Sequence, residues 1–362
     1  MTLPSTPCLM LDLDALDRNI ARMADHARAH GLALRPHAKT HKSRAIAELQ
    51  TKAGASGICC ATLHEVEQLA GAARSILLTS PVATADKFAR IAGLVSDGVD
   101  LAMVVDHPSV LPALAAALPA GGRLRLLVDV DPGSGRTGVA TPADAVALAR
   151  VIVAESRFVY GGIQFYCGSE QHIVAFAERR AAIAARNVRL AETIAALEAA
   201  GLAPLMVTGG GTGTHAIDAE AGLLTELQCG SYIFMDHDYG ACELGGAAPF
   251  EQALALYATV VSASHPGFVT LDAGTKAIAT DAGEPRVLTG VPADSRYRFK
   301  GDEFGRLDLP AGTPAPPVGT RVVLMPSHCD PTVNLHGVYH LLRGGEPAGV
   351  WPAEARGYGG HI

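Results

Sequence analysis

Short apolar runs alternate with amphipathic stretches through the first two thirds of the chain. Helical spacing is clearest over 171–200, where Ile183, Leu190, Ile194 and Leu197 recur on one face. Strands that alternate with helices build parallel βαβ units, and eight such units close a TIM barrel. A doubly wound open sheet is the competing interpretation, but it does not require eight strands. The runs with the length of buried strands are Leu32–Lys39, Gly57–Thr62, Ser75–Pro81, Asp100–Asp106, Arg123–Asp131, Tyr160–Gly168, Pro204–Thr212 and Thr225–Ile233.

The pattern changes after about residue 245, where helical spacing ends and short β runs begin. Gly, Pro and Asp separate these runs, which is typical of an antiparallel β domain. The N-terminal run Cys8–Leu13 is expected to join that domain. The predicted fold is therefore α/β, with a (β/α)8 TIM barrel over 13–245 and a C-terminal antiparallel β domain over 246–362 together with 1–12. The later runs are Leu254–Ser262, Phe268–Leu271, Tyr297–Lys300, Arg321–Met325 and Gly337–Leu342.

Composition excludes several classes of protein. The chain has 362 residues and 49% hydrophobic content, enough for a sizeable core. Its net charge of −7 and few lysines leave no basic stripe for a nucleic-acid backbone. No apolar run is long enough to span a bilayer, and residues 1–9 lack the charged and apolar regions of a signal peptide. The seven cysteines are scattered through apolar segments, as reduced core thiols are, so the expected location is the cytoplasm.

A lysine stands at the end of the first predicted barrel strand, in the run RPHAKTHK at 35–42. Active sites of such barrels lie at the carboxyl ends of the strands. Alternation places Arg35, His37 and Lys39 on one face of the strand. A desolvated lysine amine forms Schiff bases with carbonyls or with pyridoxal 5′-phosphate (PLP). A lone lysine in a loop is more often a surface residue, so other features must support this interpretation.

Two glycine-containing loops provide that support. TGGGTGT at 208–214 follows the seventh predicted strand, and Gln228-Cys229-Gly230-Ser231 lies at the eighth. Glycines let backbone N–H groups approach a phosphate, and these two loops form the usual phosphate site of barrels. One glycine run alone also makes plain turns, but two in these places favour a phosphorylated cofactor.

Other strand ends carry polar groups that suit a cofactor ring. Arg136 follows the fifth strand and is placed to meet the phenolic oxygen of PLP. Tyr166 follows the sixth strand and is placed to pack on the ring or bond to it, and His172 lies shortly beyond. Each of these residues could equally satisfy backbone groups in its loop.

The segment Ser327-His328-Cys329-Asp330-Pro331 is a candidate metal site. On a presumed strand, His328 and Asp330 share a face while Cys329 points away. Imidazole plus carboxylate suits Mn²⁺, Zn²⁺ or related ions. An isolated pair of this kind is more often a surface feature, so its value comes from combination with the lysine. His336 and His340 are less well placed.

Four motifs together resemble the D-threonine aldolase group. They are RPHAKTHK at 35–42, TGGGTGT at 208–214, LQCGSYIFMDHDYG at 227–240 and PSHCDPTVNLH at 326–336. That group stands with D-serine dehydratase among the fold-type III PLP enzymes, whose barrels are similar to alanine racemase. The resemblance covers nearly the whole chain and implies a PLP-binding barrel, a C-terminal β domain and a homodimer.

The resemblance also implies roles for single residues. A neutral partner for the pyridine nitrogen, where racemase relatives have an arginine, would not strongly favour a protonated ring. The related D-serine dehydratases have a cysteine at the Asp330 position, so the aspartate favours the aldolase branch and a hard ion: Mn²⁺ first, with Mg²⁺ and Zn²⁺ as alternatives. The implied roles are Lys39 as Schiff-base lysine, Gly211, Thr212, Gly230 and Ser231 at the phosphate, Arg136 and Tyr166 beside the ring, Gln228 near the pyridine nitrogen, and His328 and Asp330 as metal ligands.

The predicted reaction is retro-aldol cleavage of D-3-hydroxy-amino acids, with D-threonine giving glycine and acetaldehyde. A metal ion would lower the pKa of the β-hydroxyl, and His172 is the candidate base, acting directly or through a metal-bound water. The expected partners are a small amino-acid substrate and a second copy of the chain. Three alternatives stay open: cleavage of 3-hydroxy-D-aspartate to glycine and glyoxylate, dehydration of D-serine or hydroxyaspartate, and a non-catalytic PLP carrier. The β domain and the His-x-Asp pair argue against the carrier.

Overall fold

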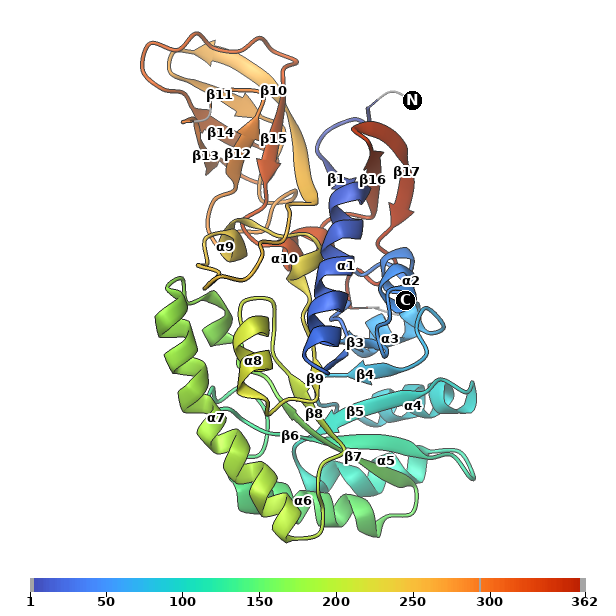
Figure 1. Cartoon of the computed structure of the whole chain (residues 1–362). Coiled ribbons are helices and arrows are strands. Elements are labelled where there is room, and N and C mark those ends of the chain that lie inside the picture. Colours follow the sequence, from blue (N-terminus) through green and yellow to red (C-terminus); the bar gives the residue numbers. More distant parts are fainter. Residues whose placement is uncertain (1–2, 293, 359–362) are drawn as a thin grey trace.

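The computed structural model describes residues 3–292 and 294–358; residues 1–2, 293 and 359–362 of the predicted domains lie outside this range. Figure 1 shows parallel strands surrounded by helices, with a second set of strands beyond one end. The first sheet has eight strands in the order β2-β9-β8-β7-β6-β5-β4-β3. They are β2 (Ala33–Leu34), β3 (Ile58–Cys60), β4 (Ile76–Leu78), β5 (Leu101–Val105), β6 (Leu124–Asp129), β7 (Phe158–Phe165), β8 (Met206–Gly209) and β9 (Glu226–Leu227).

The sheet closes into a ring between its two end strands, β2 and β3. A parallel bridge joins His37 to Cys59. The Ala38 N–H donates to the Cys59 carbonyl at 2.8 Å, and the Cys59 N–H donates to the Pro36 carbonyl at 2.8 Å. All the strand pairs of this sheet are parallel. The predicted (β/α)8 barrel is therefore confirmed.

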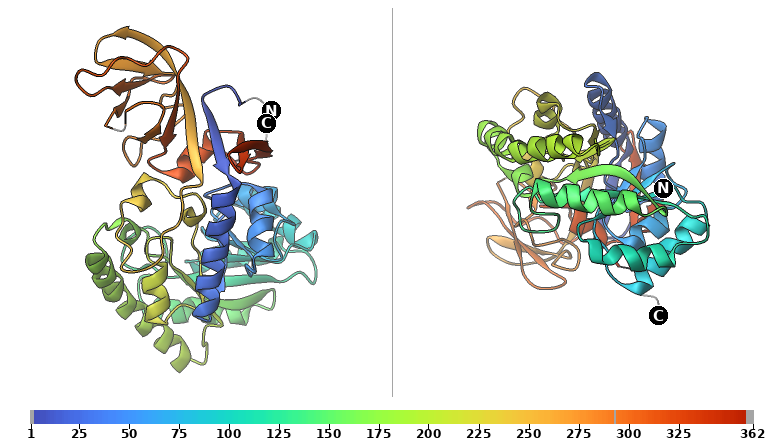
Figure 2. Two further views of the ribbon diagram at one scale, coloured as in Figure 1. Left: turned by 45° about the horizontal axis from the view of Figure 1, so that its top comes forward. Right: turned by 90° about the horizontal axis from the view of Figure 1, so that it is seen from below.

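Helices surround the barrel on its outside (Figure 2). The first begins at Asp12, whose carboxylate accepts the Asp14 N–H at 2.9 Å, and it buries Leu16, Ile20 and Met23 at helical spacing. The barrel helices are α1 (Leu13–Ala29), α2 (Arg44–Lys52), α3 (Leu63–Leu69), α4 (Ala85–Ser96), α5 (Leu111–Ala117), α6 (Pro142–Ala154), α7 (Phe176–Ala199) and α8 (His215–Ala221), with the 3₁₀ turns η1 (Pro108–Val110), η2 (Ser169–His172) and η3 (Ser231–Ile233).

The second sheet has nine strands and is antiparallel except where β1 runs parallel to β16. The sequence pattern did not indicate β12, β14 or β17. Each of them is short of buried apolar side chains, so backbone pairing holds them in the sheet. The strands are β1 (Cys8–Asp12), β10 (Leu254–His265), β11 (Phe268–Leu271), β12 (Arg286–Thr289), β13 (Arg296–Phe299), β14 (Gly305–Asp308), β15 (Arg321–Met325), β16 (Val338–Arg343) and β17 (Glu346–Pro352), and the short helices α9 (His237–Gly240) and α10 (Cys329–Asn334) connect the two bodies.

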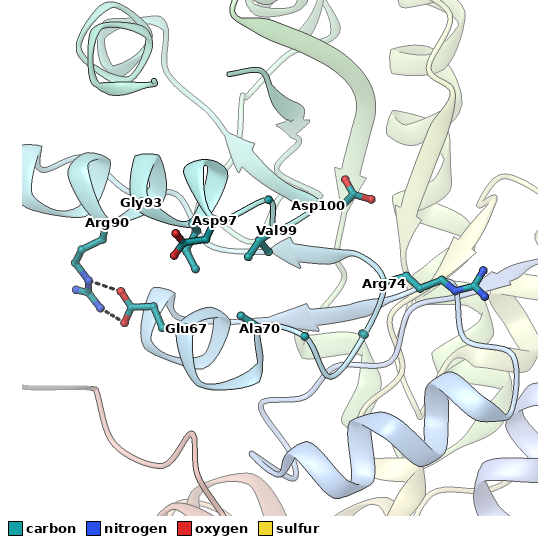
Figure 3. Close-up of a pocket in the computed structure, with 12 residues that line it drawn as sticks. Glu67, Ala70, Arg74, Arg90, Gly93, Asp97, Val99 and Asp100 are labelled. Carbon is teal, nitrogen blue, oxygen red and sulfur yellow. Dashed lines mark hydrogen bonds and ion pairs between the residues drawn. The ribbon is translucent and has the colours of Figure 1, made fainter. Parts of the chain in front are cut away.

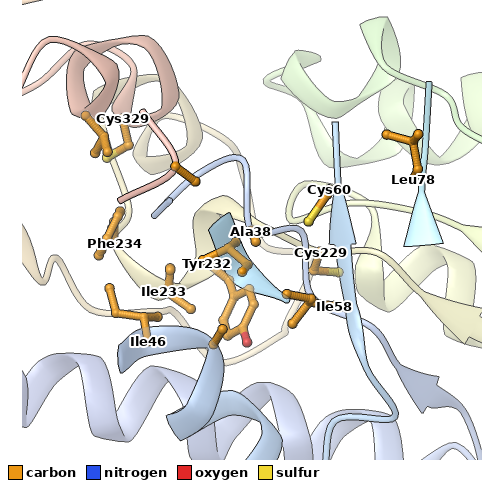
Figure 4. Close-up of a cluster of buried hydrophobic side chains, with 14 of the residues drawn as sticks. Ala38, Ile46, Ile58, Cys60, Leu78, Cys229, Tyr232, Ile233, Phe234 and Cys329 are labelled. Carbon is orange, nitrogen blue, oxygen red and sulfur yellow. The ribbon is translucent and has the colours of Figure 1, made fainter. Parts of the chain in front are cut away.

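A buried apolar cluster lies beneath the turn that carries Lys39 (Figure 4). Ala38 and Tyr232 are fully buried in it, and Phe234 and Cys329 extend it toward α10. Residues from the barrel and from the segment after β15 thus share one core. This shared core holds the two bodies together close to the carboxyl ends of the barrel strands. Within the described part of the chain, no helix has the length and apolar character needed to cross a membrane.

Candidate active site

A cavity opens at the carboxyl end of the barrel strands and brings together four residues predicted to bind the cofactor. These are Lys39, Arg136, Tyr166 and Gln228. The predicted strand Leu32–Lys39 is shorter in the structure, because β2 ends at Leu34 and the chain turns at 38–41. The remaining lining residues are His37, Ala61, Thr79, Ser80 and Gln164.

His37 orients the backbone of Lys39. The Thr79 hydroxyl donates to the Cys60 carbonyl at 3.1 Å, so His37 Nε2 is the donor in its 3.1 Å bond to that hydroxyl. His37 Nδ1 then accepts the Lys39 N–H at 3.4 Å. Burial and the neighbouring Lys39 cation hold the pKa of His37 well below its usual value. The imidazole is therefore neutral and serves as a fixed hydrogen-bonding support.

Lys39 forms an ion pair with Asp330, which lies outside the lining of this cavity. Lys39 Nζ lies 3.5 Å from Asp330 Oδ2. Burial acts to lower the pKa of Lys39, but Asp330 and Tyr166 outweigh burial and raise it. Burial acts to raise the pKa of Asp330, but Lys39 and His328 outweigh it and lower that pKa. Each group therefore stabilises the charge of the other.

The loops after β8 and β9 form a cradle of unpaired donors. Within residues 3–292 and 294–358, no acceptor meets the backbone N–H groups of Thr212, Gly230 and Ser231. The Thr40 hydroxyl is buried without a partner there, 2.6 Å from the position of a Cβ added at Gly230. A Cβ at Gly211 would meet the Gln171 side chain at 2.5 Å. A phosphate group would satisfy these donors, so the residues present fit the phosphate end of PLP.

Three residues that the sequence analysis did not single out support this cradle. Gln171 accepts the Gly213 N–H at 3.0 Å and donates to the Thr214 hydroxyl at 2.8 Å. The Thr214 hydroxyl donates to Asp218 at 2.5 Å. Burial raises the pKa of Asp218 to about 7.

Arg136 and Tyr166 lie against each other at the rim of the cavity. The guanidinium carbon of Arg136 is 5.2 Å from the centre of the Tyr166 ring. Arg136 is exposed and Tyr166 is half-buried, so both can approach a ring that enters from the open side.

The metal-binding candidates do not lie on a strand, which corrects the prediction. The strand β15 ends at Met325, His328 is the N-cap of α10, and Asp330 lies in the first helical turn. Pro331 suits the first turn of a helix because its missing N–H has no intrahelical acceptor there. His328 and Asp330 nevertheless line one cavity together with Lys39.

An aspartate missed in the sequence analysis orients His328. Asp281 Oδ2 lies 2.6 Å from His328 Nδ1, which leaves Nε2 available for an ion. The described residues contain no group of three or more His, Cys, Asp and Glu side chains able to hold a metal. His328 and Asp330 alone would supply two ligands, so an ion held there would take its other ligands from water or substrate. His336 instead bonds to the Ala277 carbonyl at 2.8 Å, and His340 lies on β16.

His172 pairs with a carboxylate that the sequence analysis also missed. Its Nδ1 contacts Asp238 Oδ2, and its ring lies 5.0 Å from that of Tyr239. The Asp238 N–H donates to the Ser327 carbonyl at 3.3 Å, so α9 lies directly against the segment that carries His328. This contact places α9 beside the segment of the metal candidates, but His172 itself is not among the described residues that line the cavities of Lys39.

A separate, open cavity of about 640 Å³ lies on the far side of the barrel (Figure 3). It is formed by the ends of α3 and α4 before β4 and β5 begin, and the ion pair between Glu67 and Arg90 lies on its wall. It contains none of the predicted site residues. Because barrel chemistry is placed at the carboxyl ends of strands, the cavity around Lys39 is the candidate active site.

Comparison with known proteins relates the two parts of the chain to two family models. Residues 11–238 match the model described as "Alanine racemase, N-terminal domain", and residues 253–342 match "Putative serine dehydratase domain". A 3-hydroxy-D-aspartate aldolase of Paracoccus denitrificans is 40% identical, covering 98% of this chain and 92% of its own. A D-threonine aldolase of Arthrobacter sp is 38% identical, covering 98% and 93%.

More distant relatives and solved structures extend the same picture. A D-threo-3-hydroxyaspartate dehydratase of Delftia sp. is 28% identical, covering 96% of each chain. The crystal structure of D-threonine aldolase from Filomicrobium marinum superposes with a TM-score of 0.92 at 36% identity, covering 97% of this chain and 96% of that one. The chain therefore belongs to the alanine racemase N-terminal domain family of fold-type III PLP proteins, in the D-threonine aldolase and D-serine dehydratase-like group.

Proposed function

We propose that this chain is a PLP- and divalent-metal-dependent aldehyde-lyase of the D-threonine aldolase type. It cleaves D-3-hydroxy-amino acids, and D-threonine gives glycine and acetaldehyde. The observation that carries the proposal is the meeting of Lys39 with His328 and Asp330 in one cavity. A Schiff-base lysine and a metal pair at this separation can act on neighbouring atoms of one substrate.

The barrel residues would hold the cofactor. Lys39 offers its amine, the amides of Thr212, Gly230 and Ser231 offer donors to the phosphate, and Tyr166 covers the ring from the rim. When bound, PLP supplies the electron sink for the bond that breaks. The neutral His37 keeps the Lys39 backbone in place, while the Asp330 carboxylate keeps the amine at the mouth of the cavity.

The residues beside the metal candidates would move the proton. His328 Nε2 and Asp330 would hold the ion, with Mn²⁺ preferred, and a divalent ion would lower the pKa of a hydroxyl bound to it. Asp238 holds Nδ1 of His172, so Nε2 is free to take the proton of the substrate β-hydroxyl. The Cα–Cβ bond would then break, and Cα would gain one proton in place of the one lost by the β-hydroxyl, so that the products are glycine and an aldehyde.

Asp330 supports C–C cleavage over dehydration. A D-threo-3-hydroxyaspartate dehydratase has been solved as a histidine mutant and as a cysteine mutant in the metal-free form, and the two mutated positions are two residues apart. His328 and Asp330 have the same spacing, with a hard oxygen in place of the thiolate. An oxygen donor suits a hard ion that acidifies the β-hydroxyl.

A second candidate substrate, 3-hydroxy-D-aspartate, is favoured by two observations. The Paracoccus aldolase of that name is 40% identical. Lys42 lines the cavity of His328 and Asp330, and its ammonium donates to Glu65 at 2.7 Å, which leaves further N–H groups for a substrate carboxylate. The same machinery would then give glycine and glyoxylate. We also propose that the protein is a homodimer, as the family resemblance implies.

Product analysis tests the proposal. The holoenzyme is incubated with D-threonine, L-threonine, 3-hydroxy-D-aspartate or D-serine, and the products are identified. We expect glycine with acetaldehyde from D-threonine, glycine with glyoxylate from 3-hydroxy-D-aspartate, and no turnover of L-threonine. Ammonia with 2-oxobutanoate from D-threonine would refute the aldolase assignment and favour a dehydratase.

A further inference from the structure

A chain of buried hydrogen bonds crosses the floor of the Lys39 cavity. It runs from Asp129 through Gln164, Gln228 and Thr208 to Glu226, and each of these residues is at most 4% exposed. Buried amides and hydroxyls have few ways to satisfy their donors and acceptors. The partners at both ends of the chain therefore decide how the amide in the middle is oriented.

The orientation of Gln164 is fixed from the Asp129 end. One atom of its amide lies 3.1 Å from the Thr79 carbonyl oxygen and 2.9 Å from Asp129 Oδ1. A backbone carbonyl only accepts, so this atom is the NH₂ group whatever the protonation state of Asp129. The other end of the amide, Oε1, therefore faces Gln228 at 3.2 Å, and it requires a donor there.

The orientation of Gln228 is fixed a second time from the Glu226 end. Glu226 is paired with Arg35 at 2.9 Å and accepts the Thr208 hydroxyl at 2.9 Å. That hydroxyl has no second proton, so it accepts from Gln228 at 3.1 Å. Gln164 and Thr208 both require a donor at the same atom of Gln228, so this atom is the nitrogen of its NH₂ group. Its carbonyl oxygen is left without a donor among the described residues, in a side chain that lines the cavity.

The cofactor would present its ring nitrogen to this carbonyl. In PLP, the ring nitrogen lies para to the carbon that joins the lysine. Lys39 reaches the mouth of the cavity beside Asp330 with its side chain 39% exposed, whereas Gln164 and Gln228 form the floor at 1% and 4%. A ring attached at the mouth, with its phosphate in the cradle, turns the opposite end toward the floor.

We propose that this chain of hydrogen bonds from Asp129 to Glu226, the relay, holds the Gln228 carbonyl toward the cofactor. The carbonyl so selects a protonated ring nitrogen, which donates a hydrogen bond to it. The inference rests on the proposed function for the presence of PLP. A neutral amide that is free to rotate could donate to a neutral ring nitrogen or accept from a protonated one. Here the relay fixes the amide so that only its carbonyl faces the cofactor. A protonated ring withdraws electrons more strongly, which suits cleavage of a bond at Cα. Asp129, Gln164, Thr208 and Glu226 are positioning residues in this account.

The test observes the resting holoenzyme and needs no turnover. The protein is reconstituted with PLP carrying ¹⁵N in the ring, and the ¹⁵N resonance is recorded without substrate. We expect the upfield position of a protonated pyridine at neutral pH. A bound cofactor with a neutral ring nitrogen would overturn this inference alone. Failure of the wild-type protein to bind PLP at Lys39 would overturn the proposed function as well.

Variants assign the effect to the relay. Gln228→Met removes the carbonyl at similar size, and we expect the resonance to move downfield toward the neutral form. Thr208→Val removes one anchor, and we expect a smaller shift in the same direction. The matched control is Thr193→Val, a buried threonine on α7 whose hydroxyl donates to the Arg189 carbonyl at 2.8 Å, and it should leave the resonance unchanged. A protonated nitrogen that persists in Gln228→Met would refute the role of the relay.

Discussion

The cofactor side and the metal side of the site are built in different ways. On the cofactor side, a chain of buried hydrogen bonds orients the side chains of the cavity floor, and Gln164 and Gln228 are almost fully buried. On the metal side, two candidate ligands stand at the start of a six-residue helix, and their support is Asp281, whose side chain is 52% exposed. Under the proposed function, this difference assigns cofactor binding to the barrel and the choice of the bond that breaks to a segment attached to it. The two properties should therefore be separable.

The largest effect is expected at the residue that both sides share. Lys39→Ala should abolish covalent attachment of PLP and all turnover, because among the described residues only Lys39 contributes an amine to the cavity lined by Arg136, Tyr166 and Gln228. Borohydride reduction of the wild-type holoenzyme should fix the cofactor to the peptide containing Lys39, as mass spectrometry would show. Lys276→Ala, an exposed residue paired with Glu303, is the control. Label on Lys42 or Lys276 would refute the assignment.

Loss of a metal ligand should lower turnover and leave cofactor binding unchanged. His328→Ala and Asp330→Ala should lower kcat by about a thousand-fold or more, because the ion stabilises charge by several kcal/mol. The visible absorbance of the bound cofactor should remain. His336→Ala, whose ring bonds to the Ala277 backbone carbonyl, is the matched control. Full activity in either ligand variant would rule out this metal site.

A smaller effect is expected at the partner of His328. Asp281→Asn should weaken metal affinity by about 10–100-fold, because Asp281 fixes the ring that presents Nε2. The activity should return at high Mn²⁺ concentration, as a titration of rate against metal would show. Asp302→Asn, also exposed, should leave the titration unchanged. Equal metal affinity in Asp281→Asn and wild type would show that His328 needs no orienting partner.

The last prediction concerns the pH dependence of stability on the cofactor side. Burial raises the pKa of Asp218 from 3.8 to about 7. Because the folded pKa exceeds the unfolded one, the contribution of this group to stability is complete below about pH 4 and is lost as the pH rises to about 7. Asp218→Asn avoids this loss and keeps an acceptor for Thr214. The free energy of unfolding of Asp218→Asn should therefore rise relative to that of wild type between these pH values, by at most ~4 kcal/mol.

Thermal unfolding across this pH range checks the Asp218 prediction. The melting temperature of wild type should fall relative to that of Asp218→Asn as the pH rises. Asp97→Asn, an exposed carboxylate at the end of α4, should follow wild type. A constant difference between Asp218→Asn and wild type at all pH values would contradict the account.

Local patterns carried the prediction of the barrel and of the cofactor side. Apolar runs with helical spacing between them indicated the parallel strands, and glycines marked the loops at 208–214 and 228–231. The lengths of β2 and β9 were overestimated, because each strand ends after two residues. The chain then turns, and these turns carry Lys39 and Ser231. Turn geometry of this kind has no hydrophobic period.

The remaining groups of the site depend on contacts between distant parts of the chain. Asp281 reaches His328 from 47 residues away, and no motif marks it. Asp238 lies within the motif at 227–240, but nothing in that motif indicates that it pairs with His172. Asp218 lies only four residues beyond Thr214, outside the motif at 208–214. The segment of His328 and Asp330 has too few apolar residues to show a period, so its helix was mistaken for a strand. The direction of the Gln228 amide follows only from the complete hydrogen-bond relay.

The most direct test of the account measures cofactor binding and turnover in one sample after metal removal. Chelation of the holoenzyme should abolish the formation of glycine from D-threonine and from 3-hydroxy-D-aspartate, because His328 and Asp330 no longer hold an ion. The absorbance of the cofactor on Lys39 should stay unchanged, and added Mn²⁺ should restore the rate. Continued formation of glycine by the metal-free, cofactor-loaded protein would contradict the division between the two sides.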